Sequence, residues 1–428
     1  MADKVSIFWF RRDLRLEDNK GLHKALQSGK KVIPIFIFDD EILDKLSKDD
    51  ARVSFIYKTL KGIDLELKKK KSSLLIKKGT LKEVWRELVK KYTIESVYTN
   101  KDYEPYAIKR DNYVREFLAS KNIHFHSFKD QVIFEENEIG KNDGLPYTVF
   151  TPFKNKWLHT FSKEKDTQEF TLDLSCFYKH TLDFPSLKFI GFIESPIKVK
   201  AYNLSNLDDY DKVRDFPSQD KTSYLSPYLR FGLVSTRKMV LIALDTNATF
   251  LSELIWREFF MQILYHFPKV VTNNFKKKYD TIVWRNNKKE FEQWCKGETG
   301  YPLVDAGMRE LNATGYMHNR VRMITAGFLC KHLLIDWRWG EAYFAEKLLD
   351  FELSSNNGNW QWAAGTGCDA APYFRIFNPT TQIKKFDKDF KYIQKWVPEF
   401  QELTYVKEIV EHKYARERCL KVYKDGLE

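Results

Sequence analysis

The chain has 428 residues, of which 43% are hydrophobic, so it is not a disordered chain, and it needs neither disulfides nor a metal to stabilise its core. Lysine and arginine (71) outnumber aspartate and glutamate (59), which gives a net charge of +12, and there are 11 Trp, 22 Tyr and 33 Phe. A basic, aromatic-rich chain is a candidate for binding planar anionic ligands such as nucleic acid, although a basic surface over an ordinary aromatic core has the same composition.

The cysteines are sparse and odd in number, and no two form a C-x-x-C pair, so the sequence predicts reduced thiols and no metal site. They are Cys176, Cys295, Cys330, Cys368 and Cys419. The chain begins Met-Ala-Asp-Lys without the apolar core of a signal peptide. The longest apolar run, near Val32–Phe38, is far too short to cross a membrane. We therefore expect a cytoplasmic protein that has no membrane partner.

The first 130 residues alternate short β-rich runs with polar segments of helical period. The expected strands are Val5–Phe10, Val32–Phe38, Leu74–Lys77, Ile94–Thr99 and Ile123–Phe128. Thr80–Lys91 and Ala107–Ser120 are expected helices between them. This order predicts a parallel α/β sheet of Rossmann-like type. No G-x-G-x-x-G follows the first strand, so the usual dinucleotide fingerprint is absent.

Residues 131–200 are rich in Gly and Pro and show no sustained period, which indicates an interdomain linker or, equally, a small irregular subdomain. From residue 201 to 428 the spacing of apolar residues is helical, and we expect an all-helical domain. The expected helices include Thr236–Leu244, Leu251–Tyr265, Leu303–Asn312, His318–Leu334 and Ala342–Leu349. The predicted organisation is therefore an α/β domain (1–130), a linker (131–200) and a helical domain (201–428).

The segment Lys221–Tyr228 combines hydroxyl side chains with a helix start. Ser226 before Pro227 is typical of a helix N-cap with proline at the first helical position. With Thr222 and Ser223 alongside, this is a candidate phosphate cradle, although an ordinary capped helix has the same pattern.

Two predicted helices carry charged residues on faces that would otherwise be apolar. Glu253, Trp256, Arg257 and Phe260 share one face, which indicates a pocket wall. Asn319, Arg322 and Met323 repeat the pattern, with Arg320 to one side. An arginine on an apolar helix needs a partner, and Asp350 and Glu352 are candidates.

The stretch Asp350–Pro379 is dense in small residues, Asn, Gly and Trp, without helical or strand period. Such a segment inside a helical domain is typical of a binding loop. Trp360 and Trp362 are then ligand-facing aromatics, or alternatively core residues.

Several motifs resemble the photolyase/cryptochrome family in the expected order along the whole chain. They are Phe8–Asn19 (FWFRRDLRLEDN), Arg214–Pro217 (RDFP), Thr222–Ser226 (TSYLS), Ile255–Phe259 (IWREF), Met317–Met323 (MHNRVRM), Asn356–Trp362 (NNGNWQW) and Phe374–Pro379 (FRIFNP). The nearest resemblance within the family is to class I cyclobutane pyrimidine dimer photolyases. The resemblance implies an antenna domain followed by a helical domain that binds FAD, active as FADH−.

The resemblance also implies a set of cofactor residues around the flavin. It assigns Asn356 to flavin N5, pairs Arg322 with Asp350, and places Glu352, where the family more often has Asp, at the ring's polar edge. The full implied set is Tyr210, Thr222, Ser223, Tyr224, Leu225, Ser226, Arg257, Asn319, Arg322, Asp350, Phe351, Glu352 and Asn356.

The chemistry of the lesion site distinguishes the members of the family. Enzymes for the (6-4) photoproduct resemble each other in having His where this chain has Asn319 and Met323, and neither residue is an acid at neutral pH. Splitting a cyclobutane dimer needs an electron but no protein acid. Trp256 and Trp362 would then clasp a flipped-out dimer, with Met323 in the gap and Glu253 on a pyrimidine edge.

The expected function is light-driven repair of cyclobutane dimers in DNA by electron transfer from excited reduced FAD. The alternative is a blue-light photoreceptor without repair. Plant-type photoreceptors have Asp where this chain has neutral Asn356, which tolerates an anionic flavin, and the short segment after Pro379 is not expected to be a signalling tail.

Further residues are implied by the same resemblance. Trp360, Trp337 and Trp284 match the family's electron relay, although core packing would also explain them. DNA contacts are expected from Arg214, Arg320 and Gln382. A second antenna chromophore of folate, deazaflavin or flavin type is conceivable, but Pro105–Ala107 lacks the acidic residue of folate-binding members. We expect a monomer of prokaryote-like type, in the nucleoid when bound to DNA.

Overall fold

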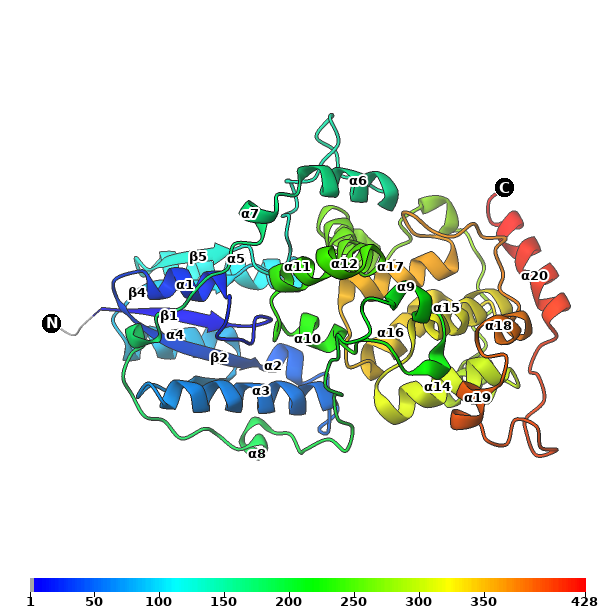
Figure 1. The fold of residues 1–428 in the computed structure, drawn as a ribbon, viewed down its shortest axis with the longest axis horizontal. Coiled ribbons are helices and arrows are strands. Elements are labelled where there is room, and N and C mark those ends of the chain that lie inside the picture. Colours follow the sequence, from blue (N-terminus) through cyan, green and yellow to red (C-terminus); the bar gives the residue numbers. More distant parts are fainter. Residues whose placement is uncertain (1–3) are drawn as a thin grey trace. The chain divides into compact units, whose positions relative to one another are not determined.

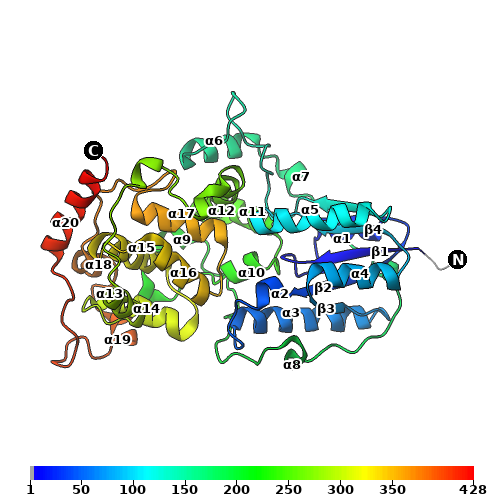
Figure 2. The ribbon, with the colours of Figure 1, turned by 180° about the vertical axis from the view of Figure 1, so that it is seen from behind.

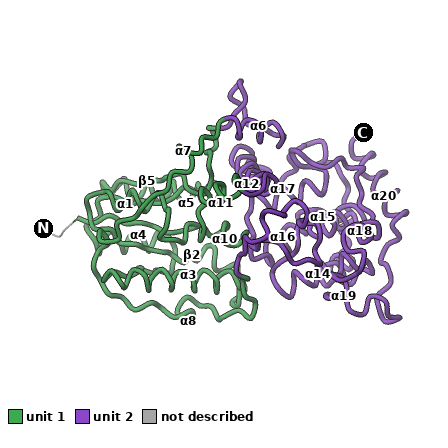
Figure 3. The backbone as a smooth tube through the Cα atoms, viewed as in Figure 1, with its two compact units in different colours: residues 1–138, 160–200, 225–245 green, residues 139–159, 201–224, 246–428 purple. Residues whose placement is uncertain are grey.

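The structure is a computed structural model, and it describes residues 4–428. The chain forms two compact units, which Figure 3 shows in different colours. Unit 1 contains the residues up to 138 together with 160–200 and 225–245, and unit 2 contains 139–159, 201–224 and 246–428. Each unit is therefore discontinuous in sequence, and each is described by itself below.

Unit 1 is built on a five-stranded parallel sheet in the order β3-β2-β1-β4-β5. The strands are β1 (Val5–Phe10), β2 (Lys31–Asp39), β3 (Leu75–Gly79), β4 (Ile94–Asn100) and β5 (His124–Phe128). The predicted parallel α/β sheet is thus confirmed, with strand ends that differ by a residue or two. Side chains alternate along β1, so Ile7 and Trp9 enter one apolar core and Phe8 and Phe10 the other.

Helices cover both faces of this sheet, as Figures 1 and 2 show. Helices α1 (Lys20–Leu26) and α3 (Ala51–Lys68) share a core with Phe8 and Phe10. Helices α4 (Leu81–Lys91) and α5 (Pro105–Ala119) pack on the opposite face. Burial on both faces explains why the central strands β1 and β2 are nearly continuous hydrophobic runs in the sequence.

A buried ion network ties the segment 225–245 to the rest of unit 1. Arg237, in α11, donates to Asp18 and Asp130, and Arg15 donates to the same Asp130 at 2.7 Å. Paired and hydrogen-bonded charges of this kind tolerate burial, whereas unpaired charges do not. The remaining helices of unit 1 are α2 (Asp40–Leu43), α7 (Lys163–Asp166), η1 (Leu174–Cys176), α8 (Leu187–Ile190), α10 (Ser226–Arg230) and α11 (Thr236–Thr246).

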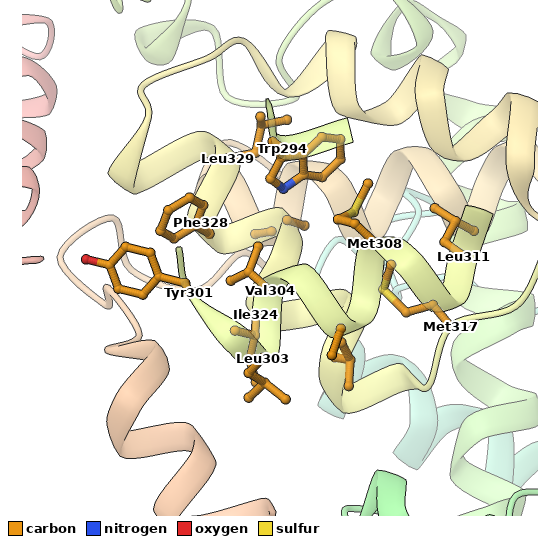
Figure 4. Close-up of a cluster of buried hydrophobic side chains, with 14 of the residues drawn as sticks. Trp294, Tyr301, Leu303, Val304, Met308, Leu311, Met317, Ile324, Phe328 and Leu329 are labelled. Carbon is orange, nitrogen blue, oxygen red and sulfur yellow. The ribbon is translucent and has the colours of Figure 1, made fainter. Parts of the chain in front are cut away.

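Unit 2 is helical. Its longer helices are α6 (Phe150–Thr160), α12 (Ala248–His266), α13 (Lys288–Lys296), α14 (Pro302–Thr314), α15 (Asn319–Gly327), α16 (Trp337–Lys347), α17 (Leu353–Ala364), α18 (Pro379–Phe386) and α20 (His412–Asp425). Shorter ones are α9 (Tyr210–Val213), η2 (Pro217–Gln219), η3 (Pro268–Val271), η4 (Lys277–Tyr279), η5 (Phe328–His332) and α19 (Lys391–Trp396). Figure 4 shows the core around Trp294, Met308 and Phe328, and α15 and α17 both contribute side chains to this core.

Three sequence-based expectations in the helical part were wrong in detail. Most of Asp350–Pro379 was expected to be a loop, but Leu353–Ala364 is the helix α17. Packing against α12, α15 and α16 overrides the weak helix propensity of its Asn, Ser and Gly residues. The segment His318–Leu334 is α-helical only to Gly327, after which Phe328–His332 form a π-helix, and the helix expected over Ala342–Leu349 is α16, Trp337–Lys347.

The expected cap at Ser226 was also wrong. Ser226 is the first helical residue of α10, Leu225 occupies the cap position, and no side chain caps the helix. Pro227 lies at the start of the helix as expected. Within residues 4–428, no helix has the length and apolar character that crossing a membrane requires.

Candidate functional site

Two arginine–carboxylate pairs form the centre of the candidate site in unit 2. Arg322, on α15, donates to both carboxylate oxygens of Asp350 at 3.2 and 2.9 Å. Its Nε also donates to the carbonyl oxygen of Met317 at 2.8 Å. Burial lowers the pKa of Arg322, but the negative charge of Asp350 and its hydrogen bonds to Arg322 act in the opposite direction, and the net effect is a raised pKa. The expected Arg322–Asp350 pair is therefore present and carries a fixed positive charge.

The second pair joins α12 to the start of α17. Arg257 Nη2 donates to Glu352 Oε1 at 3.2 Å, and both side chains are largely buried. The hydroxyl of Ser355 donates to the other carboxylate oxygen of Glu352. Of the two candidate carboxylates, Glu352 thus forms an ion pair with Arg257 and Asp350 forms one with Arg322. Sequence spacing alone left this assignment open.

The side chain of Asn356 is held by a residue that the sequence analysis missed. Its amide nitrogen donates to the backbone oxygen of Glu341 at 3.0 Å and to Glu341 Oε1 at 2.9 Å. Burial raises the pKa of the Glu341 carboxyl. The amide nitrogen of Asn356 thus faces α16 and its oxygen faces away. A lone glutamate in an amphipathic helix offers no sequence signal for this role.

Tyrosine rings connect the segment that is expected to bind the phosphates to the Arg322–Asp350 pair. Tyr224 packs on Tyr316 with ring centroids 4.7 Å apart, and the Arg322 guanidinium lies 5.7 Å from the Tyr316 ring. The pKa of Tyr210 is raised by burial and by the nearby carboxylate of Glu253. Tyr316, which sequence reasoning missed, therefore links residues expected at opposite parts of the ligand.

The other expected cofactor residues vary in exposure. Thr222, Ser223 and Phe351 are half-buried in unit 2, whereas Asn319 is exposed at the first position of α15. Leu225, which is buried, and Ser226, which is half-buried, belong to unit 1.

His318 caps α15 and is a further residue that the sequence did not single out. Its Nδ1 accepts from the backbone nitrogen of Arg320 at 3.2 Å, and its buried Nε2 has no hydrogen-bond partner among the described residues. Burial, followed by the positive charge of Arg322, lowers the pKa of His318 to about 4. The imidazole is therefore neutral at pH 7 and is no proton donor there.

We expect the buried histidines to make folding sensitive to mild acid. Burial lowers the pKa of His318 to about 4 and that of His332 to about 3. In mild acid each histidine is therefore protonated in the unfolded chain but neutral in the folded chain. The free energy of unfolding should rise with pH between about 4 and 6.5. Lowering the pH from 7 to 5 should reduce it by about 2 kcal/mol for each of the two histidines. Urea unfolding at both pH values measures this.

A matched variant isolates one of the two groups. His318→Asn keeps a capping acceptor and removes the titration. The variant should lose about half as much of this stability as the wild type on going from pH 7 to pH 5. An unchanged pH dependence would contradict the assignment.

Four of the residues expected at the lesion or the DNA lie on four different helices of unit 2. Trp256 on α12, Met323 on α15, Trp362 on α17 and Gln382 on α18 are all half-buried, so part of each is accessible. The ring of Phe150 stacks on Trp256 with centroids 3.6 Å apart and planes 9° apart.

The expected DNA-binding arginines are engaged in ion pairs within the chain. Arg214 Nη1 donates to Glu253 Oε1 at 2.5 Å, and Arg320 Nη2 donates to Asp215 Oδ1 at 2.5 Å. The Arg320 guanidinium also lies 4.4 Å from the ring of Phe386, which places it beside α18 and hence near Gln382. Glu253, expected to bind a pyrimidine edge, is thus oriented by Arg214.

The three tryptophans that are expected to form the electron relay are buried to different degrees. Trp360 and Trp337 are buried, and Trp337 Nε1 donates to Asn274 Oδ1 at 2.8 Å. Trp284 is partly exposed and packs edge-on against Tyr423. Gly340 permits α16 to approach Trp360, because a Cβ there would lie 2.1 Å from the Trp360 ring. Of the three, only Trp284 has an accessible part, whereas Trp360 and Trp337 are 2% and 0% exposed.

Comparison with known families identifies this arrangement. Residues 6–171 match the DNA photolyase model, and residues 250–404 match the FAD binding domain of DNA photolyase. The chain belongs to the DNA photolyase family. The FAD-binding region of the match contains both arginine–carboxylate pairs as well as Asn356 and Trp360, so the site lies in the family's flavin domain.

Photolyases from bacteria and archaea resemble the chain over nearly its whole length. The deoxyribodipyrimidine photo-lyase of Vibrio cholerae is 34% identical over 98% of this chain and 99% of its own. A class III photolyase from Agrobacterium tumefaciens has a TM-score of 0.88 at 32% identity and covers 100% of this chain and 98% of its own. An archaeal photolyase from Sulfolobus tokodaii, solved with two FAD molecules, has a TM-score of 0.87 at 36% identity, with 98% and 99% covered.

The residues present fit the FAD that the family domain implies. Fixed guanidinium groups at Arg257 and Arg322 offer donors to the carbonyl oxygens and phosphates of a dinucleotide. Asn356 is a neutral amide beside them, and the buried Nε2 of His318 is a polar atom with no partner among the described residues. This donor set suits an anionic, polar-edged ring system.

Proposed function

We propose that the protein repairs cyclobutane pyrimidine dimers in DNA under light. The observation that carries this proposal is the chemistry of four residues of the expected lesion face, Trp256, Trp362, Met323 and Asn319, beside which Glu253 is ion-paired with Arg214. None of these side chains donates a proton at neutral pH, and the neighbouring His318 is held neutral. Such a face supports a reaction driven by an electron rather than one that needs a protein acid.

The cofactor and the chain divide the chemistry between them. FAD, held by the residues described above, would in its reduced form supply an electron on excitation and take it back after the dimer opens. Asn356 places no negative charge at the ring, and Arg322 supplies a positive one, so both favour an anionic reduced state. Trp256 and Trp362 offer aromatic faces to a flipped-out dimer, and Glu253 offers a carboxylate to a pyrimidine edge.

Lesion specificity tests this proposal. Two oligonucleotides that carry either a cyclobutane dimer or a (6-4) photoproduct are illuminated with protein containing reduced flavin. We expect loss of the cyclobutane dimer and no change in the (6-4) product. Repair of the (6-4) product would show that a proton donor has been overlooked and would overturn the proposal.

We also propose that Arg214, Arg320 and Gln382 contact the DNA. Arg320→Ala should weaken binding to dimer-containing DNA and should reduce the slope of log K against log salt by about 1, because one phosphate contact is lost. The control is Arg309→Ala, since Arg309 forms a similarly exposed ion pair with Glu399 but is not expected at the DNA. A salt slope that is the same in both variants would remove Arg320 from the interface.

The same proposal covers the second chromophore, the oligomeric state and the location. We propose a monomer in the cytoplasm that can carry an antenna pigment of folate, deazaflavin or flavin type. Absorption spectra of pigments released from the purified protein distinguish these classes. A folate spectrum would be unexpected, because Pro105–Ala107 lacks an acidic side chain.

A further inference from the structure

The starting observation is the ring of Phe150 on the ring of Trp256. The two planes are nearly parallel and the centroids lie 3.6 Å apart, so one face of the indole is covered by a fixed phenyl ring. Phe150 is buried, at 8% exposure, whereas Trp256 keeps an accessible part. Phe260, one turn further along α12, also stacks on the indole, with ring centroids 5.3 Å apart and planes 29° apart. The indole is therefore held by aromatic rings, and part of it stays accessible to a ligand.

Helix α6, which begins at Phe150, is fastened to α12, which carries Trp256. The indole nitrogen of Trp157 donates to Glu258 Oε1 at 2.8 Å, and Lys154 Nζ donates to Ser252 Oγ at 2.6 Å. Figures 1 and 2 show α6 lying beside α12 in both views. Because Trp157 and Glu258 are both buried, this attachment holds Phe150 in place over the indole.

A third contact ties the start of α6 to the segment that follows Trp362, the second tryptophan that is expected to clasp the dimer. The backbone nitrogen of Phe150 donates to Asp369 Oδ2 at 3.0 Å. Asp369 lies just after α17, the helix that carries Trp362. Phe150 thus stacks on Trp256 and is anchored to the chain segment that follows Trp362.

We propose that Phe150 is a positioning residue that holds the Trp256 ring ready for a flipped-out pyrimidine before DNA binds. This inference rests on the proposed function. A partly exposed tryptophan loses rotational freedom when a base stacks on it, which weakens binding. A ring already clamped by Phe150 has lost that freedom in the free protein. Removing the clamp should therefore weaken lesion binding without altering the photochemical step.

Phe150→Leu tests this directly. The variant keeps an apolar side chain but removes the stacked ring, and Kd and KM for dimer-containing DNA should rise about three- to tenfold. The value of kcat with reduced flavin and the rate of flavin photoreduction should stay at the wild-type level. Phe150→Tyr, which retains a ring, should restore the affinity. The control is Phe153→Leu, because Phe153 lies on the same helix and packs on Tyr147 and Phe259.

A double-mutant cycle separates positioning from general destabilisation. If Phe150 acts through Trp256, then Phe150→Leu should have little further effect on Kd in a Trp256→Ala background. Additive effects in the cycle, or an unchanged Kd in Phe150→Leu, would overturn the proposal. Phe150→Met fills the same space without a ring and serves if the leucine variant does not fold. Failure of the wild type to repair dimers would instead remove the proposed function itself.

Discussion

Replacing Arg322 with leucine is expected to destabilise the protein by about 2–4 kcal/mol, because it removes the charged donor of two hydrogen bonds to the largely buried carboxylate of Asp350. The Asp350 side chain is only 7% exposed, and Arg322 supplies two of its hydrogen bonds. The carbonyl of Met317 loses its donor as well. Urea unfolding at pH 7 measures the loss, and flavin content after purification should fall in parallel.

Two further variants make this expectation specific. Adding Asp350→Asn to Arg322→Leu removes the uncompensated charge, so the double variant should be more stable than the single one. Arg309→Leu, which breaks the more exposed pair with Glu399, should cost only about 1 kcal/mol or less. Equal losses for Arg322→Leu and Arg309→Leu would contradict the structural role of the Arg322–Asp350 pair.

Replacing Trp360 with phenylalanine is expected to abolish light-driven reduction of oxidised flavin, because a phenyl ring is far harder to oxidise than an indole. Repair by protein whose flavin has been reduced chemically should persist, since the proposed repair step does not pass through Trp360. Absorption spectra recorded during illumination with an external reductant measure the first effect, and a dimer assay measures the second.

The matched control for this variant is Trp294→Phe. Trp294 is a buried indole whose ring centroid lies 6.1 Å from that of Trp360, but it is outside the proposed relay. Its substitution should leave photoreduction intact while it disturbs the core to a similar degree. Wild-type photoreduction in Trp360→Phe, or equal loss in Trp294→Phe, would contradict the assignment of Trp360.

The central strands could be predicted closely from the sequence because they are buried on both faces. Val32–Phe38 is apolar throughout and Val5–Phe10 is apolar except for Ser6, and the limits of both runs coincide with a loss of apolar character. Helix α17 could not be predicted in this way. Its stability comes from packing against neighbouring helices, and Gly358 permits a close approach to Phe260, where a Cβ would lie only 2.2 Å from the ring.

The charged residues of the site were predictable because buried charges need partners. That rule identified Asp350 and Glu352 as candidates for arginines, and the structure pairs them with Arg322 and Arg257. Glu341, Tyr316 and Phe150 were missed. Each acts through a contact with a residue distant in sequence, and residue type alone does not show such contacts.

The central claim is that this chain opens cyclobutane dimers by using light and reduced flavin. The most direct measurement is the absorbance near 260 nm of a dimer-containing oligonucleotide incubated with the purified, flavin-reduced protein under blue or near-ultraviolet light. The account predicts a light-dependent rise as intact pyrimidines return, and no rise in darkness. No rise under illumination with fully reduced flavin and saturating substrate would contradict it and would favour a photoreceptor without repair.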